Sequence, residues 1–350
     1  MPAGVFKEKY SQLMAHLRYP VHWAALATGA ALLLALPRIA GSYVADLAVD
    51  AMIFLVAAIG LNITTGLAGQ ISLAQAALMG VGAFTVAKIG SMLAAWGVPG
   101  AALLMIPVAG ILAAVIGLVV GLPSFKLKDY YLAMASIAAQ SVLVYIFKVW
   151  IDTSQGVPVS DAAKTVAGIY FGSNPVLYYT VLAVTIAAVL TAANIGRSSL
   201  GRAFKAVRDN DVSASIVGID TARAKALAFA LGAFYAGIAG ALYALKNVSV
   251  TWEAFTLDTS IELLAIVLVG GAGRIIWGSL LGVLLLHTGW TLLSNLSGVA
   301  LLPAWLGGET ALRYLLFGVL VAAFVVKEPE GLIGVLRRIK EYFKLWPFSY

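Results

Sequence analysis

Long apolar runs alternate along the chain with short polar stretches. Several runs reach the ~20 residues that a helix needs to cross the hydrocarbon core of a membrane. The pattern therefore predicts an all-α integral membrane protein with about ten transmembrane helices. The apolar segments are 21–36, 44–61, 71–92, 99–122, 130–150, 175–195, 226–245, 259–273, 277–297 and 310–326.

Composition and charge agree with a membrane protein and argue against a soluble one. Hydrophobic residues make up 61% of the 350 residues and charged residues only 11%, too little polar surface for a soluble protein of this size. The formal net charge of +7 comes from residues at segment ends and in loops, where anionic lipid headgroups are the natural counterion. We therefore expect lipid, and no nucleic acid, as a partner. The chain has no cysteine, which excludes disulfides, thiolate chemistry and cysteine-ligated metals.

Lysine and arginine residues indicate the orientation of the chain. The longest polar stretch, residues 196–225, is strongly basic, and so is the C-terminal tail. With about ten spans and a cytoplasmic N-terminus, both fall on the cytoplasmic side, as the positive-inside rule requires. We expect cytoplasmic segments at 1–20 and 327–350 around a single transmembrane domain at 21–326. The first apolar segment also fits a cleaved signal peptide, because a basic stretch precedes it.

Polar and helix-breaking residues interrupt the apolar pattern directly after Leu61. The stretch 62–72 predicts a broken helix, because irregular backbone at membrane depth survives only when it is buried in protein or lines a water-filled cavity. Broken helices are also where transporters bind substrate. A surface turn is the alternative. A count of ten spans would also permit an inverted repeat, with spans two to five and seven to ten starting from opposite sides.

The neutral polar side chains in and near this stretch are candidates for a translocation pathway. They can donate and accept hydrogen bonds, which suits a zwitterion or a small amide. The alternative is that they form interhelical hydrogen bonds that stabilise the bundle. The candidates, with two glycines of the same stretch, are Asn62, Thr64, Thr65, Gly66, Gly69, Gln70, Ser72, Gln75, Gln140 and Tyr145.

Carboxylates within the apolar segments bear on the idea of an ion-coupled carrier, which needs such groups at membrane depth. Asp46 and Asp50 lie four residues apart, and Glu262 lies near the start of the eighth segment. All three fall near the predicted outer boundary of the membrane. We therefore expect them to be interface groups rather than members of a proton relay.

Four motifs, in the same order, resemble those of a known family. The first is LNITTGLAGQISLAQAALMGVGAF at 61–84, and the second is GRAFKAVRDNDVSASIVGID at 201–220 with KALAFALGAFYAGIAGALYA at 225–244. SIELLAIVLVGGAGRIIWGSLLG at 260–282 and Pro329-Glu330-Gly331-Leu332 complete the set. On these motifs the chain resembles the permease subunits of ABC importers for branched-chain amino acids, the LivM type, with urea and amide permeases as close relatives.

The chain also departs from the family's pattern. Gln140 stands where members usually carry an acidic residue, and 152–158 stands in place of a glycine-rich segment. The glycine-rich stretch 270–278 is longer than usual and contains Arg274. These differences leave the expected fold unchanged and leave the solute open. A sugar or nucleoside permease of the same superfamily is therefore an alternative.

The resemblance implies a transport subunit that is not an enzyme and has no cofactor of its own. The sequence agrees, since it lacks a phosphate-binding loop of the G-x-x-x-x-G-K-[ST] type. The implied partners are a second homologous permease, two ABC ATPase subunits that bind ATP and magnesium, and an extracytoplasmic solute-binding protein. The implied location is the cytoplasmic membrane of a bacterium or archaeon. An ion-coupled secondary transporter or a passive channel would need none of these partners.

The resemblance also implies that the loop 196–225 transmits force, because a short helix of this loop sits in a cleft of the ATPase subunit in such importers. Its mixture of charged and apolar residues fits this role, and Asp209, Asn210 and Asp211 predict a helix break or cap in its middle. A solvated loop that only fixes the topology is the alternative. The implied coupling residues are Arg202, Phe204, Lys205, Val207, Arg208, Asp209, Asn210, Asp211, Ser213, Ala214 and Gly218.

Overall fold

The computed structural model describes most of the chain. The described residues are 20–98, 100–122, 129–150, 156–166, 169–172, 174–289, 291–292, 318–319, 321–324, 326–328 and 330–345. Most of the predicted N-terminal segment 1–20 and of the tenth apolar segment therefore lies outside the described residues.

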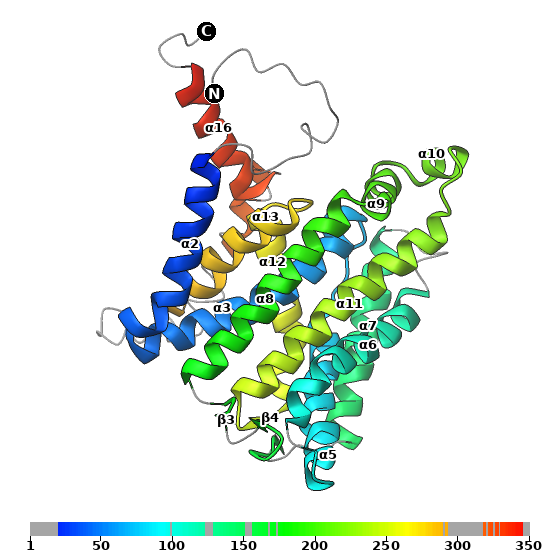
Figure 1. The fold of residues 1–350 in the computed structure, drawn as a ribbon. Coiled ribbons are helices and arrows are strands. Elements are labelled where there is room, and N and C mark those ends of the chain that lie inside the picture. Colours follow the sequence, from blue (N-terminus) through cyan, green and yellow to red (C-terminus); the bar gives the residue numbers. More distant parts are fainter. Residues whose placement is uncertain are drawn as a thin grey trace, which may run out of the picture.

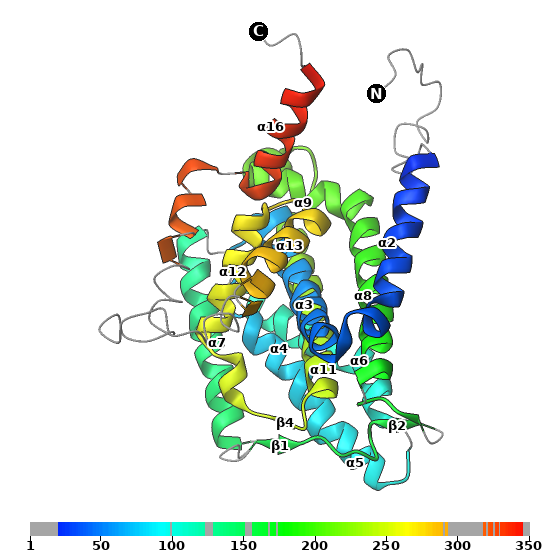
Figure 2. The same ribbon diagram turned by 90° about the vertical axis from the view of Figure 1, so that its left-hand side faces the viewer.

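The chain folds into a bundle of long helices with short strands at one end (Figure 1 and Figure 2). The predicted all-α fold class is thereby confirmed. The α-helices are α2 (Pro20–Ile39), α3 (Gly41–Leu61), α4 (Gln75–Phe84), α5 (Ser91–Ala95), α6 (Ala101–Gly121), α7 (Asp129–Trp150), α8 (Asn174–Arg197), α9 (Ser199–Asp209), α10 (Asp211–Ile216), α11 (Thr221–Lys246), α12 (Leu257–Gly270), α13 (Ile275–Gly282) and α16 (Gly331–Leu345).

Shorter elements connect or continue these helices. Strands β1 and β4 pair antiparallel, as do β2 and β3. The strands are β1 (Val157–Pro158), β2 (Thr165–Val166), β3 (Ile169–Tyr170) and β4 (Ser249–Val250). The π-helices are η1 (Asn62–Leu67), η2 (Thr85–Gly90) and η5 (Val283–Thr288), and the 3-10 helix is η4 (Trp252–Phe255).

The described residues contain fewer transmembrane helices than the ten predicted. Within the described residues, six helices are long and apolar enough to cross a membrane, and a bent pair raises this number to at most seven. Helix α2, from the first apolar segment, has 20 residues and is not among the six. The inverted repeat that a count of ten suggested stays a prediction. The six are Gly41–Leu67, Gln75–Ala95, Ala101–Gly121, Tyr131–Val149, Pro175–Arg197 and Thr221–Lys246.

The bent pair corrects the prediction of separate spans at 259–273 and 277–297. Helix α12 meets α13 and η5 at an angle of 117°, so the pair forms one broken span or a re-entrant loop. Helix α12 has only 14 residues, which makes about 21 Å of helix against a hydrocarbon core of about 30 Å. The turn uses Gly271 and Gly273, both with positive φ. The apolar pattern predicts an interruption between 273 and 277, but hydropathy does not give the angle between the two helices.

Helix α11 lies at the centre of the bundle, against α3, α4 and α6. Glycines allow this close packing. A Cβ atom added at Gly240 would overlap the carbonyl oxygen of Met79 in α4, and one added at Gly82 would overlap the carbonyl oxygen of Gly237 in α11. Small residues bring membrane helices together in this way because packing, rather than the hydrophobic effect, holds helices together in lipid.

The two ends of the bundle differ in character. Helices α9, α10 and α16 lie at one end, here called the α9 end, and the strands and α5 lie at the other, the β end (Figure 1). At the β end, Lys246 forms an ion pair with Asp50, with Nζ 2.5 Å from Oδ2. Lys164 donates a hydrogen bond to the carbonyl of Asn247 at 2.8 Å, and its burial lowers its pKa. These lysines at the β end are therefore held by groups of their own chain.

Helix α16 is seated on the turn between α12 and α13. Gly331, its first residue, has a φ of +68°, and a Cβ atom there would lie 2.7 Å from both the amide nitrogen of Gly271 and the carbonyl oxygen of Val269. Only glycine allows this approach without strain. The glycine of the Pro-Glu-Gly-Leu motif thus fixes the start of the C-terminal helix to the bent pair.

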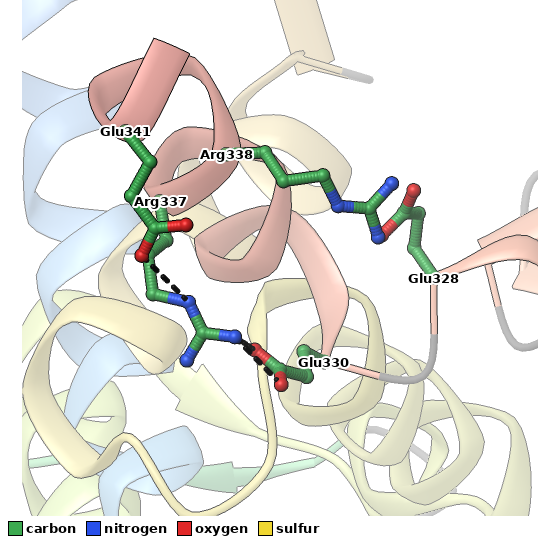
Figure 3. A network of polar contacts seen from close by, with 5 residues as sticks. All are labelled: Glu328, Glu330, Arg337, Arg338 and Glu341. Carbon is green, nitrogen blue, oxygen red and sulfur yellow. Dashed lines mark hydrogen bonds and ion pairs between the residues drawn. The ribbon is translucent and has the colours of Figure 1, made fainter. Parts of the chain in front are cut away.

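Ion pairs add to the placement of α16 (Figure 3). Arg337 lies between Glu330 and Glu341, with Nη2 2.8 Å from Glu330 Oε2 and Nε 3.8 Å from Glu341 Oε1. Arg338 Nη2 lies 2.6 Å from Glu328 Oε2. Exposed pairs of this kind contribute roughly 0–1 kcal/mol each, so they orient the helix more than they stabilise it.

The glycine contacts of α11 give a first testable prediction. Replacing Gly240 with Ala should lower the thermal unfolding midpoint in detergent, because overpacking a tight helix contact costs about 1–3 kcal/mol. Gly29→Ala in α2 is the matched control, since a Cβ atom there meets nothing within 4 Å. Equal midpoints for the two variants would contradict the close packing of α4 against α11.

Candidate functional site

The helix break predicted at 62–72 is present. Helix α3 continues directly into the π-helix η1, and the backbone then runs without helical structure until α4 begins at Gln75. Gly69 has a φ of +70°, and Thr65 Oγ1 donates to the carbonyl of Gln70 at 3.1 Å across the turn. Thr64 Oγ1 lies 3.3 Å from the carbonyl of Ala228 in α11. Residues 62–68, Gln70 and Ser72 are buried while Gly69 and Ile71 are exposed, so most of the break packs inside the bundle.

Asn62 joins the break to the bent pair. Its Oδ1 accepts a hydrogen bond from the amide of Gly273 at 2.9 Å. Its Nδ2 donates to Ser279 Oγ at 3.1 Å and lies 3.4 Å from the carbonyl of Arg274. The side chain is completely buried. Asn62 therefore satisfies polar groups of both elements and works as an interhelical connection.

Gln75 and Gln140 make similar connections. Gln75 Nε2 donates to the carbonyls of Ala57 in α3, at 3.1 Å, and Gly232 in α11, at 3.2 Å. Gln140 Oε1 accepts from the amide of Ala77 at 2.9 Å, and its Nε2 donates to the carbonyl of Phe255 at 2.7 Å. Both side chains are buried and tie neighbouring elements together.

Gln70 and Ser72 differ from these residues. Gln70 is 4% exposed and Ser72 is 1% exposed, yet neither the Gln70 carboxamide nor the Ser72 hydroxyl has a hydrogen-bond partner in the described part of the chain. Buried polar groups are nearly always hydrogen-bonded, so unpartnered ones need an explanation such as a water or a bound solute. These two residues are therefore the strongest pathway candidates. Tyr145 is 64% exposed on α7 and does not join them.

The basic loop folds as two short helices at the α9 end. Ser198 Oγ accepts from the amide of Gly201 at 3.3 Å at the start of α9. Asn210 Oδ1 accepts from the amides of Val212, at 2.9 Å, and Ser213, at 3.0 Å, and so caps α10. The cap predicted from the sequence is thereby confirmed. Lys225 forms an ion pair with Asp211, which ties α10 to the start of α11.

The coupling candidates separate into inward and outward groups. Phe204, Val207 and Ala214 are buried against the bundle, while Arg202 and Lys205 are exposed. Asp209, Asn210, Ser213 and Gly218 are exposed as well, and Asp211 is half-buried. Arg208 reaches inward although much of its side chain is exposed, because Nη1 donates to the carbonyl of Gly66 in the helix break at 2.6 Å.

Three exposed apolar side chains, here called the apolar tip, lie in the basic loop. Val212 is 60% exposed, Ile216 79% and Val217 81%, all on or beside α10. None of these three is among the coupling residues that the resemblance implies. The run Ser-Ile-Val-Gly at 215–218 is short, and nothing in its pattern alone says which way its side chains face.

Three serines that hydrogen-bond buried or partly buried polar groups were not predicted from the sequence. Ser279 binds Asn62, Ser260 Oγ accepts from the amide of Ala76 at 2.9 Å, and Ser136 Oγ accepts from the amide of Leu73 at 2.9 Å. Each is a serine within an apolar helix, which is a usable sequence signal because a buried hydroxyl needs a partner.

One partly buried pair of titratable groups lies apart from the break. His287 Nδ1 lies 3.0 Å from Glu262 Oε1, and the imidazole stacks on Phe54 with 3.7 Å between ring centroids. Within the described ranges, no group of three His, Asp or Glu side chains could hold a metal ion.

The Gln140 geometry gives a second prediction. Gln140→Leu should lower the thermal unfolding midpoint, because it leaves the Ala77 amide and the Phe255 carbonyl unpaired at about 1–3 kcal/mol each. Ser141→Ala is the control, since that exposed hydroxyl bonds only within its own helix. An unchanged midpoint with lost transport would instead make Gln140 a pathway residue.

Comparison with known proteins agrees with this architecture. The family described as branched-chain amino acid transport system / permease component matches residues 43–325. The high-affinity branched-chain amino acid transport system permease protein LivM of Escherichia coli (strain K12) is 26% identical over 319 residues, which cover 83% of this chain and 70% of the relative. The probable LivM of Methanocaldococcus jannaschii is 29% identical over 265 residues, covering 71% of this chain and 74% of the relative. No solved structure gives a significant match. The chain therefore belongs to the family of branched-chain amino acid transport system permeases.

Proposed function

We propose that this chain is the membrane-spanning subunit of an ABC importer and that separate ATPase subunits dock on α9 and α10. The observation that carries the proposal is the exposed apolar tip of Val212, Ile216 and Val217 at the α9 end. These side chains lie together on a basic loop, where lipid does not cover them. A partner protein with an apolar cleft would cover them.

The orientation follows from the same end of the bundle. Basic residues of α9, of the start of α11 and of α16 gather there, which favours the cytoplasmic side. The β end would then face the outside and receive solute from an extracytoplasmic binding protein. A second, homologous permease would complete the pathway. ATP and magnesium would be bound by the ATPase subunits and not by this chain.

The solute we propose is a branched-chain amino acid, carried inward. The relatives are branched-chain amino acid permeases by name, and the unpartnered Gln70 and Ser72 offer neutral donors and acceptors to a zwitterion. Urea and small amides suit the same groups. Gln140 stands where the family usually has an acidic residue, and that replacement left a sugar or nucleoside as an alternative solute. The Gln140 side chain hydrogen-bonds the amide of Ala77 and the carbonyl of Phe255. We therefore take the replacement to affect helix packing more than the choice of solute.

A substitution at the apolar tip tests the docking proposal. Val217→Asp should reduce co-purification of the co-expressed ATPase subunits at least ~10-fold, because a carboxylate buried without a partner in an interface costs more than 1.4 kcal/mol. Val248→Asp is the matched control, since Val248 is 80% exposed and lies beside β4 at the β end. We expect this control to retain the ATPase subunits.

Two results would contradict the proposed function. The first is a parent protein that retains no ATPase subunit under conditions in which both are expressed. The second is uptake in vesicles that proceeds without ATPase subunits and stops when a proton or sodium gradient is removed, which would indicate a secondary transporter.

A further inference from the structure

We propose that Arg208 is the positioning residue through which movement of α9 reaches the helix break, and that it does not serve to hold the ATPase. The inference rests on the proposed function, since it takes the ATPase to be what moves α9. Three observations support it: the hydrogen bond from Arg208 to Gly66, the contacts of Arg208 with two glycines, and the exposed position of Arg223 in the same loop.

The hydrogen bond joins a cation to the end of a long membrane helix. Arg208 Nη1 donates to the carbonyl of Gly66 at 2.6 Å, and Gly66 lies in the last turn of the continuous helix formed by α3 and η1. Carbonyls at the end of a helix lack partners within the helix, and the helix dipole places partial negative charge there. A guanidinium satisfies both requirements, and charge-assisted bonds are roughly twice as strong as neutral ones.

Two glycines form the seat of the Arg208 side chain. A Cβ atom at Gly69 would lie 2.9 Å from Arg208 Cγ, and one at Gly273 would lie 2.6 Å from Arg208 Nη1. Both glycines have positive φ, +70° and +86°. The stem of Arg208 therefore passes the turn of the helix break, and its head reaches the turn of the bent pair. Any side chain at either glycine would displace it.

The two glycines that contact Arg208 are connected to Gln70 and Ser72, whose side chains lack hydrogen-bond partners among the described residues. Asn62 holds Gly273 and Ser279 by hydrogen bonds, so the break and the bent pair share one joint. Gln70, with its free carboxamide, directly follows Gly69 in the chain. A displacement of Arg208 by a few ångströms must therefore shift the backbone that carries Gln70 and Ser72.

Another arginine of the loop lacks such contacts. Arg223 has a side chain that is 85% exposed, and its guanidinium pairs with Asp220 three residues earlier. Arg223 thus carries the same charge at the same end of the bundle without touching the break. It provides a control that has the same charge in the same loop, although it lies on α11 and pairs with Asp220.

Reconstitution with the ATPase subunits and measurement of uptake tests the inference. Arg208→Ala should retain ATPase co-purification and ATP hydrolysis but lower solute uptake per ATP at least ~10-fold, because the charge-assisted bond between α9 and the helix break is lost. Arg223→Ala should match the parent. Arg208→Lys should recover part of the uptake, because it keeps the charge and loses the planar fork.

A second variant fills the seat while Arg208 stays in place. Gly273→Ala should uncouple uptake from hydrolysis in the same way, because its Cβ would displace the guanidinium. Gly97→Ala is the control for backbone strain, since Gly97 has a similar φ of +85° and open space around it. If Gly273→Ala transports like the parent, the seat is not part of the coupling.

A labelling experiment separates transmission from general destabilisation. The chain has no cysteine, so Ser72→Cys introduces its only thiol. With Arg208 present, the rate at which a maleimide labels this thiol should change at least ~2-fold when ATP is trapped on the complex, because the break moves. With Arg208→Ala the rate should be the same in both nucleotide states.

Two outcomes would overturn the inference. Loss of the ATPase subunits from Arg208→Ala would make Arg208 a docking residue. Unchanged uptake together with unchanged nucleotide-dependent labelling would remove it from the coupling. A parent complex that shows no ATP-driven uptake would instead overturn the proposed function, so the two failures are distinguishable.

Discussion

The structure depends on one constraint, that backbone polar groups within the hydrocarbon layer must find partners inside the protein. The chain breaks a membrane helix after Leu67 and must therefore supply these partners from elsewhere. Arg208 donates to the carbonyl of Gly66, Thr65 donates to that of Gln70, and Ser136 accepts from the amide of Leu73. Close packing against α11, made possible by glycines on both sides, keeps lipid away from these bonds. Most of the helix break is therefore buried, with Gly69 and Ile71 exposed.

Distant parts of the sequence meet at the break. Arg208 of α9 donates to the carbonyl of Gly66, and the amide of Gly273 in the bent pair donates to Asn62. Gly331 of α16 packs against Gly271 in the same turn of the bent pair. Gln70 and Ser72 remain unpartnered at the break. Within the described part of the chain, Thr185 in α8 and Thr288 in η5 also lack partners, but only Gln70 and Ser72 lie beside the Arg208 contact, which fits the proposed pathway. The positions most exposed to a partner are those of α10.

Much of this architecture could be predicted from the sequence, because apolar length and helix-breaking residues act locally. The all-α class, a helix break within 62–72 and the cap at Asn210 followed from such local signals, although the helix continues to Leu67 before it breaks. The sharp bend between α12 and α13 did not follow from them, because the apolar pattern predicts an interruption there but not the angle between the two helices. The sequence also could not predict which polar residues line a pathway and which join helices. Asn62 bonds groups more than two hundred residues away, and only the fold decides whether an amide lines a pathway or joins two helices.

Amide hydrogen exchange in the complex, with and without trapped ATP, tests the central claim that movement of α9 and α10 reaches the helix break. The account predicts that trapping ATP changes the exchange of the amides at 69–73 together with those of α9 and α10. A change confined to α9 and α10, with identical exchange at 69–73 in both states, would contradict it.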